Sequence, residues 1–519
     1  MFRKILFSAA VMLMAAVKIS AYSDPSVLIP EPVEYSVSEG VYTLKPDGSD
    51  VKVYIGPASF AEKVADLPDF AQEEAYELVV GKKGVKIYAM TQEGAFRGRQ
   101  TLEMLRLIDP SVKFCNIFDY PRFRHRGIML DESRSFKGKE FVKKQIDALA
   151  LLKMNVMHLH LTDAAGWRLQ IDAYPNLTDH VAWRIGETYH EWEGLGYPFT
   201  NADDPNAYGG FYTKDDIREI VAYAAERHID IIPEIEMPGH SMEVNRAYPE
   251  ISCVGPDGKP RPFSWDLCVG NEGTFEFLET VLAEVIELFP YKYIHIGGDE
   301  AVKKDWDECV NCRRRMEEEG MTHKNELQGY MVRRIEAFLR ERGRTVIGWD
   351  EIVDTGLPEQ AVVMSWRGTP GGIKAASQGH DVIMSPNSYV YLDYYQDLIR
   401  KEPKAVGHMQ SLRHVYKYDP LEGIDPEFHH HILGLQGNLW CELIPYAAHA
   451  EYMLYPRAFA IAEIGWTPQE NREFFHFRSR CLTLVTVFRS LGYNTFDLFN
   501  ETLKAQTGRL SFNDPNFKL

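Results

Sequence analysis

The sequence predicts an α/β protein in which a closed (β/α)8 barrel, the TIM barrel, follows a smaller α+β domain. Three observations support this prediction. Eight short apolar runs recur after residue 120, helical periodicity separates most of them, and nearly every run ends on a polar or aromatic residue. Strands that alternate with helices pair in parallel, and eight such units close into a barrel. With 519 residues and 45% apolar content, the chain is long enough to bury both parts.

The first 21 residues are predicted to be a signal peptide. Arg3 and Lys4 precede an apolar stretch at 5–17, and small residues follow at Ser20 and Ala21. The stretch is short for a membrane span, and no later segment approaches one. We therefore expect cleavage near Ala21, no stable membrane span afterwards, and export to a bacterial periplasm or the cell exterior. A retained anchor is the alternative.

Residues 22–120 are expected to form the small α+β domain. A helical stretch at 93–107 closes this segment. Three short β-like runs precede it, at 51–55, 76–80 and 85–90. The expected linker to the barrel is 118–123.

The barrel is expected over 121–470, with a helical extension over 471–519. Its eight predicted strands are 127–131, 156–163, 230–236, 293–299, 346–350, 362–366, 382–385 and 434–440. Predicted helices between them include 139–153, 214–227, 274–289 and 324–342. A doubly wound open sheet is the alternative, but no Gly-rich phosphate loop follows the first strand.

The composition excludes some classes of function. The formal net charge is −18, from 57 basic and 75 acidic residues, without long runs of one sign. A nucleic-acid-binding protein normally carries a basic face, so no nucleic-acid partner is expected. The aromatic content of 12% suits a neutral substrate such as a sugar, whose ring stacks on aromatic faces, although aromatic residues also fill ordinary cores.

The ends of the predicted strands are the expected location of the active site. The run 293–300 is the most informative, because it stops on the adjacent carboxylates Asp299 and Glu300 directly after two glycines. Paired acids in a barrel are typical of glycoside hydrolysis, whereas two solvated acids at a strand end are the alternative. Other strands end similarly, on Asp131 with Arg134, Asp163, Glu236 with His240, Trp349 with Asp350, Trp366 with Arg367, and Trp440 with Glu442.

Eight motifs follow one another along the predicted barrel. They are Arg126-Gly127 through Asp131-x-Ser133-Arg134, His158-Leu159-His160-Leu161-Thr162-Asp163, Met237-Pro238-Gly239-His240, Gly297-Gly298-Asp299-Glu300, Trp349-Asp350-Glu351, Ser365-Trp366, Tyr391-Leu392-Asp393 and Leu439-Trp440-x-Glu442. Any one of them is weak evidence, but the ordered set resembles glycoside hydrolase family 20, the β-N-acetylhexosaminidases. The resemblance covers roughly 122–470, and the segment before it resembles the family's usual N-terminal α+β domain.

The resemblance implies a substrate-assisted mechanism, in which the sugar's own 2-acetamido group is the nucleophile and closes an oxazoline. Glu300 would be the general acid and then the base that activates water. Asp299 would accept the acetamido N–H and balance the developing charge. Tyr391 would donate a hydrogen bond to the acetamido oxygen and hold it in line for attack.

The resemblance also implies a set of substrate-binding residues. Trp349, Trp366 and Trp440 would wall the pocket around the acetamido methyl and the sugar face. Arg134 and Glu442 would bind ring hydroxyls on the far side, because hydrogen bonds to charged groups are strong.

Three further residues complete that set. Asp393 would bind another hydroxyl, while Asp163 and His240 would lie behind the general acid and orient it. Ala164 and Ala165 depart from the family pattern, which usually has polar residues there. This departure can reshape either the rim of the site or the surroundings of the general acid, and it leaves the substrate range open.

Two geometric questions are left open by the sequence. Adjacent residues of a strand point to opposite faces, so the chain must bend at the strand end to bring Asp299 and Glu300 to one site. A long segment at 176–211 is expected to be a rim loop. Its aromatic residues either form a further sugar platform or pin the loop, and the largest of them are Trp183, Trp192 and Tyr197.

Seven cysteines occur in the chain. In an exported protein, Cys253 and Cys268 can close the loop between them with a disulfide. Cys309 and Cys312 have the spacing of half a zinc site, but no second Cys or His pair accompanies them nearby in the sequence, so a short disulfide or free thiols are favoured over metal. No metal and no organic cofactor are expected.

The expected partner is a glycan with a terminal β-linked GlcNAc or GalNAc, and the oligomeric state is not predicted. Alternatives within the enzyme class are a disaccharide-releasing or transglycosylating relative. A non-catalytic sugar-binding barrel is a further alternative. A nucleotide cyclase also carries Gly-Gly-Asp-Glu, but there Phe follows, whereas here Ala301 follows in a chain with an export signal.

Overall fold

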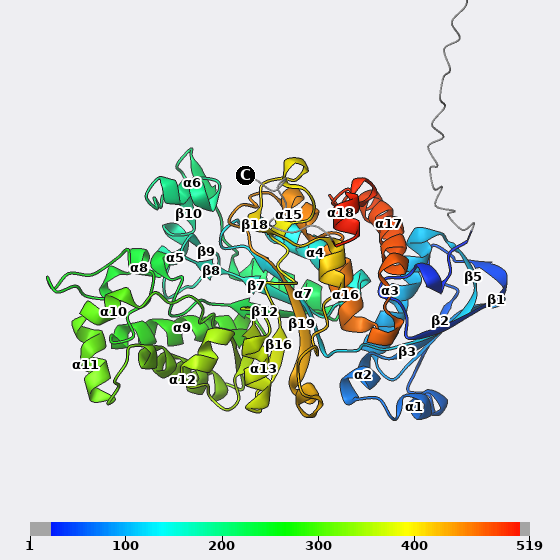
Figure 1. Cartoon of the computed structure of the whole chain (residues 1–519), viewed down its shortest axis with the longest axis horizontal. Helices are drawn as coiled ribbons and strands as arrows, with labels where there is room; N and C mark the ends of the chain where they lie inside the picture. Colours follow the sequence, from blue (N-terminus) through cyan, green and yellow to red (C-terminus); the bar gives the residue numbers. More distant parts are fainter. Residues whose placement is uncertain (1–21, 509–519) are drawn as a thin grey trace, which may run out of the picture.

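The computed structural model describes residues 22–508 and confirms both parts of the expected fold (Figure 1). The predicted signal peptide lies outside the described residues, as do residues 509–519 of the predicted helical extension. A mixed sheet forms the N-terminal part, and a barrel with its surrounding helices forms the rest.

The N-terminal part is a five-stranded sheet in the order β1-β5-β3-β4-β2. Its strands are β1 (Glu34–Thr43), β2 (Val51–Ile55), β3 (Tyr76–Gly81), β4 (Gly84–Ala89) and β5 (Ser111–Asp119). Its helices are α1 (Ala58–Val64), α2 (Asp69–Glu74) and α3 (Gln92–Ile108). Helix α3 begins at Thr91, whose side chain accepts a hydrogen bond from the Gly94 N–H. The sequence predicted β2, β3, β4 and α3, but it missed β1 and β5.

The barrel is closed, with strands in the order β12-β13-β14-β15-β16-β19-β6-β7. All neighbouring pairs are parallel. The strands are β6 (His125–Asp131), β7 (Val156–His160), β12 (Asp230–Glu234), β13 (Tyr293–His295), β14 (Thr345–Trp349), β15 (Val362–Ser365), β16 (Val382–Met384) and β19 (Ile432–Leu439). These are the eight predicted runs. Most end earlier than predicted, because their polar last residues leave the ladder and enter the loops that form the site.

Helices surround the barrel and connect its strands. The main ones are α4 (Lys139–Leu151), α7 (Lys214–Ala225), α9 (Glu272–Leu288), α12 (Asn325–Arg340), α13 (Pro370–Ser377), α14 (Leu412–Tyr416), α15 (Ala447–Leu454) and α16 (Arg457–Trp466). Helix α7 starts with a capping box between Thr213 and Asp216. After β14 the chain makes only the 3-10 helix η3 (Asp350–Asp354), so this repeat lacks a full helix.

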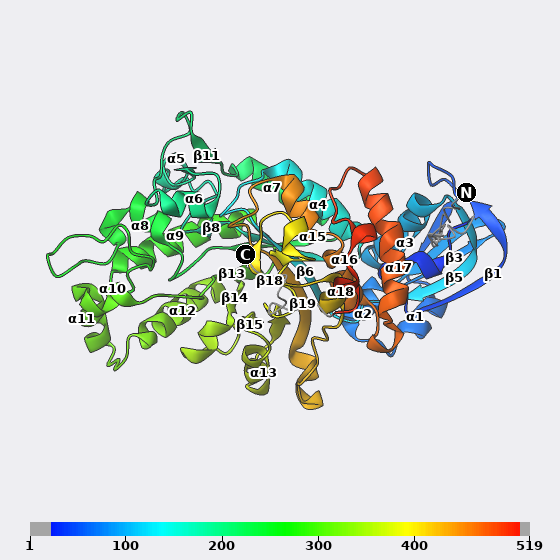
Figure 2. The same cartoon turned by 45° about the horizontal axis from the view of Figure 1, so that its top comes forward.

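Helix α17 (Phe474–Ser490), which follows the barrel, lies beside α3 and joins the two parts (Figure 2). Arg480 of this helix forms ion pairs with Glu463 of α16 at 2.6 Å and with Glu31 at 2.9 Å. A second buried pair, Lys153 with Asp119 at 2.6 Å, links the end of α4 to β5. Breaking one partner of a buried pair leaves an uncompensated charge, so these contacts disfavour separation of the two parts.

The loop after β7 is long and carries its own small elements. They are β8 (Thr162–Asp163), β9 (Gly166–Trp167), α5 (Asn176–Asp179), β10 (Trp183–Ile185), α6 (Tyr189–Gly194) and β11 (Ala207–Gly209). Trp192 is fully buried and packs in edge contacts on Tyr197 and Phe199, so it pins the loop and is no sugar platform.

Ala164 and Ala165 are buried in the same apolar cluster as Trp192. They do not line the cavity described below, but the backbone N–H of Ala164 donates to Asp163 Oδ1 at 2.6 Å, so their effect on the substrate range stays a prediction.

The expectation that no second pair of ligands accompanies Cys309 and Cys312 is wrong. Cys309 and Cys312 do have a second pair beside them, because Cys253 and Cys268 lie in the same buried cluster. The Cys253–Cys268 disulfide that the sequence allows is not formed, and none of the seven cysteines belongs to a disulfide. Among the described residues, no helix combines the length and the apolar character that crossing a membrane requires.

Candidate active site

A cavity of about 260 Å³ opens where the barrel strands end. Its lining residues are Arg134, His240, Asp299, Glu300, Trp349, Trp366, Tyr391, Asp393, Tyr394, Val406, Trp440 and Glu442. The structure therefore brings together every candidate residue from the sequence except Asp163. Sequence reasoning missed Tyr394 of β17 (Tyr394–Tyr395) and Val406 of β18 (Val406–Met409). Tyr394 directly follows a recognised motif, whereas no signal distinguished Val406 from a core residue.

A bend after β13 brings both carboxylates to this cavity, as the sequence required. The strand ends at His295, and the backbone then turns through positive φ at Gly297 (67°), Gly298 (99°) and Glu300 (47°). A side chain at Gly297 would meet the Glu236 carboxylate at 1.8 Å, so the turn needs glycine there. The left-handed conformation of Glu300 is rare for a non-glycine residue and is typical of functional sites.

The two carboxylates differ in exposure. The Asp299 side chain is 11% exposed, whereas that of Glu300 is 59% exposed. Asp299 therefore lies deep in the cavity and Glu300 at its mouth. The two acids therefore face different surroundings, one enclosed by the cavity and the other open to bulk solvent.

His240 joins the two acids to a buried carboxylate. Its Nε2 lies 3.4 Å from Asp299 Oδ2 and 3.6 Å from Glu300 Oε2, and its Nδ1 lies 3.3 Å from Asp163 Oδ2. Burial acts to lower the pKa of His240, but the charges of Asp163 and Asp299 outweigh it and raise that pKa well above its usual range. The imidazole is thus held as a cation that orients both acids.

Asp163 lies behind the cavity wall and does not line it. It accepts from Arg134 Nη2 at 2.7 Å and from His160 Nε2 at 3.1 Å, in addition to His240. Burial acts to raise its pKa, but the Arg134 and His240 cations hold the pKa of Asp163 well below its usual range. Asp163 is therefore a permanent anion that positions two cavity residues.

Four aromatic side chains form one wall of the cavity. Trp366 and Tyr391 are stacked with ring centroids 6.2 Å apart, and Trp440 lies 6.2 Å from Tyr391 and 5.8 Å from Trp349. Two of the three indole N–H groups are already engaged: Trp349 donates to Glu234 at 2.7 Å, and Trp366 donates to Glu351 at 2.9 Å. The rings are thereby fixed, and their apolar faces are left for a ligand.

Several polar atoms of the cavity residues are buried without a hydrogen-bond partner among the described residues. They are Arg134 Nε, Asp299 Oδ1, Asp393 Oδ1 and Glu442 Oε2. Such atoms are costly unless a ligand or water satisfies them. Burial, with the nearby charge of Glu442, raises the pKa of Asp393 well above its usual range. The cavity therefore suits a neutral ligand with several hydroxyl or amide groups.

The family model described as glycosyl hydrolase family 20, catalytic domain, matches residues 123–469. The chain belongs to glycosyl hydrolase family 20. This confirms the resemblance drawn from the eight motifs. The nucleotide cyclase alternative is excluded, because the Gly-Gly-Asp-Glu run lies in a family 20 barrel.

Curated relatives and solved structures agree with this family. A β-hexosaminidase of Porphyromonas gingivalis is 41% identical over 428 residues, which are 79% of this chain and 53% of the relative. One of Akkermansia muciniphila is 33% identical over 456 residues, 85% of this chain and 89% of the relative. A family 20 exo-β-N-acetylglucosaminidase of Vibrio harveyi, solved with N-acetylglucosamine, has a TM-score of 0.77 at 30% identity and covers 92% of this chain and 79% of its own.

The chain is shorter than some of these family 20 relatives. It spans about half of the P. gingivalis protein and 65% of a β-hexosaminidase of Vibrio furnissii, to which it is 38% identical over 409 residues.

The stability of the folded protein is expected to depend on pH through Glu351. Burial, followed by the charge of Asp299, raises its pKa from 4.5 to about 8. The folded protein thus keeps a proton that the unfolded chain releases, and it loses stability as the pH rises from 4.5 to 8. We expect Glu351→Gln to raise the melting temperature relative to the unsubstituted protein by about 1–3 °C at pH 9, with little change at pH 4.

Thermal unfolding of both proteins at the two pH values checks this. Glu359→Gln is the matched control, because Glu359 is exposed in the same region. A Glu351→Gln variant that is equally destabilised at both pH values would show that Glu351 is ionised in the folded protein at neutral pH.

Proposed function

We propose that the protein is an exo-acting β-N-acetylhexosaminidase that removes terminal β-linked GlcNAc or GalNAc by retaining, substrate-assisted hydrolysis. The observation that carries the proposal is the placement of Asp299 and Glu300 at two depths of one small cavity. The names of the relatives support it, as does the N-acetylglucosamine bound to the V. harveyi enzyme.

The deep acid is suited to hold the acetamido group. Asp299 Oδ1 has no partner among the described residues and is available to accept the acetamido N–H. Tyr391, buried on the aromatic wall, is available to donate its hydroxyl to the acetamido oxygen. Two such contacts would orient the oxygen toward the anomeric carbon and convert the attack into a positioned intramolecular step.

The acid at the mouth is suited to proton transfer. As the acetamido oxygen bonds to the anomeric carbon, Glu300 would give its proton to the glycosidic oxygen, and the leaving sugar would depart as an alcohol. Glu300 would then take a proton from water, which attacks the anomeric carbon and reopens the oxazoline to the acetamide. Two displacements at one carbon retain its configuration. The His240 cation beside both acids would position them throughout.

The size and lining of the cavity favour removal of single terminal sugars. A volume of about 260 Å³ lies below the usual range for drug-sized ligands, which suits one sugar ring. Arg134, Asp393 and Glu442 line the cavity and offer hydrogen bonds to ring hydroxyls. A terminal residue would be enclosed, and the rest of the glycan would extend past Glu300 into solvent.

The test is release of p-nitrophenol from the β-GlcNAc and β-GalNAc glycosides beside the β-glucoside, with inhibition by GlcNAc-thiazoline. Cleavage of only the acetamido sugars, blocked by the thiazoline, is the expected result. Product analysis on longer glycans separates the disaccharide-releasing and transglycosylating alternatives. Failure to cleave any substrate would favour a sugar-binding barrel without activity.

The proposal includes export to the periplasm or the cell exterior. The support is the sequence of residues 1–21, where a basic start precedes an apolar stretch and small residues. Cell fractionation followed by N-terminal sequencing tests it. We expect the mature protein to start near residue 22, outside the cytoplasm.

A further inference from the structure

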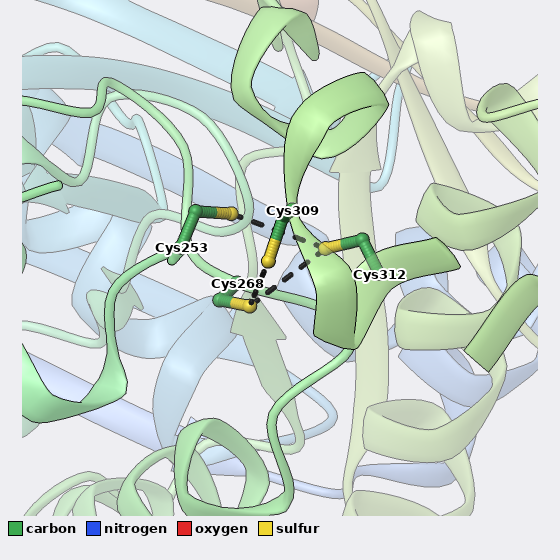
Figure 3. Close-up of side chains that lie close together, drawn as sticks. All are labelled: Cys253, Cys268, Cys309 and Cys312. Atoms are coloured by element: carbon green, nitrogen blue, oxygen red, sulfur yellow. Dashed lines mark hydrogen bonds between the residues drawn. The ribbon is translucent and has the colours of Figure 1, made fainter. Parts of the chain in front are cut away.

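Four buried cysteines from separate segments meet at one point, away from the catalytic cavity. Cys253 follows the 3-10 helix η2 (Pro249–Ile251), Cys268 precedes α9, and Cys309 and Cys312 lie at the start of α11 (Val310–Glu318). Figure 3 shows their sulfur atoms turned toward a common centre. The proposed hydrolysis uses none of them.

The spacing of the sulfur atoms identifies what the cluster suits. Cys268 Sγ lies 3.7 Å from both Cys309 Sγ and Cys312 Sγ, and Cys253 Sγ lies 3.9 Å from Cys312 Sγ. All four atoms lie within 4.8 Å of one another. Four thiolates bound at about 2.3 Å to a tetrahedral Zn²⁺ stand about 3.8 Å apart, and the observed distances match that edge.

We propose that these four cysteines bind one structural Zn²⁺ ion. Four protein ligands complete a tetrahedron and leave no open position, which is typical of structural rather than catalytic zinc. The Cys309–Cys312 spacing, with two residues between, is that of one half of such sites. The backbone N–H of Val254 donates to Cys309 Sγ at 3.4 Å, a contact that stabilises a bound thiolate.

Two disulfides are the competing chemistry in an exported protein. A disulfide requires two sulfur atoms at about 2.05 Å, and its formation from two thiols needs an oxidant. No two of these sulfur atoms are bonded, since all four cysteines are free, and Cys268 Sγ is equally far from Cys309 Sγ and Cys312 Sγ. An arrangement in which the sulfur atoms surround a centre, without separating into pairs, favours a metal ion.

The position of the cluster gives the ion a role in the active site. Cys253 and Cys268 belong to the loop after β12, which also carries His240, while Cys309 and Cys312 follow β13 and the two acids. These loops touch closely: a Cβ added to Gly270 would lie 2.2 Å from the Cys312 nitrogen.

Hydrogen bonds continue this contact toward Glu300. Asp266 accepts from the backbone N–H groups of Val302, at 3.0 Å, and Lys303, at 2.5 Å. The indole N–H of Trp306 donates to the Leu267 carbonyl at 3.0 Å. The ion would therefore fasten the segment that directly follows the proposed general acid to the loop that carries His240.

The first experiment measures the metal content of the purified full-length protein, without substitutions, by mass spectrometry after dialysis against metal-free buffer. We expect about one zinc per chain, released when a mercurial titrates the thiols. Intact mass with alkylation under denaturing, non-reducing conditions should show all four cluster thiols. Less than stoichiometric zinc, iron in its place, or a mass lower by four hydrogens with blocked thiols would each overturn the proposal.

Substitutions then locate the ion. Cys268→Ala should lose the zinc, whereas Cys115→Ala, a buried cysteine of β5 outside the cluster, is the matched control and should retain it. If Cys268→Ala fails to fold, the metal content of the unsubstituted protein still shows whether the protein binds zinc. Retention of one zinc per chain by Cys268→Ala would place the ion elsewhere.

The role in the active site rests on the proposed function and is measured separately. Removal of zinc by a chelator should lower the melting temperature by several degrees and reduce kcat several-fold, and added Zn²⁺ should restore both. A protein that binds zinc but cleaves no glycoside would contradict the proposed function and leave the metal site intact. An unchanged melting temperature and kcat after removal of the metal would show that the ion has no structural role.

Discussion

Replacing Glu300 with Gln is expected to reduce turnover of a GlcNAc disaccharide by about 10²–10⁴-fold. The amide keeps the bulk of the side chain but has no proton to give to the leaving oxygen. The fold should be preserved, because the Glu300 side chain is 59% exposed and contributes little to the core. The measurement is kcat/KM on the disaccharide and on the p-nitrophenyl glycoside.

The comparison of the two substrates separates acid catalysis from a general loss of activity. p-Nitrophenol is a good leaving group that needs little protonation, whereas a sugar alcohol is a poor one. We therefore expect the loss in Glu300→Gln to be larger on the disaccharide. Glu317→Gln, at an exposed glutamate of α11, is the matched control and should have normal activity. Near-normal turnover of the disaccharide by Glu300→Gln would exclude Glu300 as the acid.

The second large effect is expected for Asp299→Asn, which should reduce kcat/KM on β-GlcNAc substrates by about 10²–10³-fold. Asp299 Oδ1 is buried without a partner among the described residues, so it is free to accept the acetamido N–H. Asparagine also loses the negative charge that balances the oxazolinium. The same change removes the ion pair with His240 at 3.4 Å.

A sugar without the acetamido group tests whether this loss is specific. Residual turnover of the p-nitrophenyl β-glucoside should fall much less than turnover of the β-GlcNAc glycoside, and binding of GlcNAc-thiazoline should weaken. Asp203→Asn, at an exposed aspartate of the long loop after β7, is the matched control. An equal loss on both sugars would argue that Asp299 supports the structure of the site and does not assist the substrate's own nucleophile.

The sequence predicted the barrel well because its strands are buried on both faces. Such strands are continuous apolar runs, as in β6, where every residue is buried, and they are visible without knowledge of their partners. It missed β1, which is exposed along almost its whole length and whose alternation of apolar and polar residues stops after Val37. That strand is specified by its pairing with β5, which is a long-range contact.

The candidate site also combines features that the sequence predicted with features that only the fold revealed. The motifs placed ten candidate residues at the cavity, because a parallel barrel puts all strand ends on one face. The position of Asp163 behind the wall was not visible from the sequence, since it depends on contacts with Arg134 and His240. Two glycines indicated a turn before Asp299, but the left-handed conformation of Glu300 became evident only in the fold.

The sequence by itself determined the family, the eight strands and the paired acids, because these features lie in short segments whose pattern does not depend on distant residues. Only the tertiary structure showed that four of the cysteines lie together. Cys253 and Cys312 are 59 residues apart, and neither half of the cluster has a complete metal site of its own. They meet because β12 and β13 are neighbours in the barrel, so the loops after them share one edge. The predicted barrel already makes these consecutive strands neighbours, but the paths of their loops, which bring the four sulfur atoms together, depend on contacts between the loops and are not encoded in the spacing of residues along the chain.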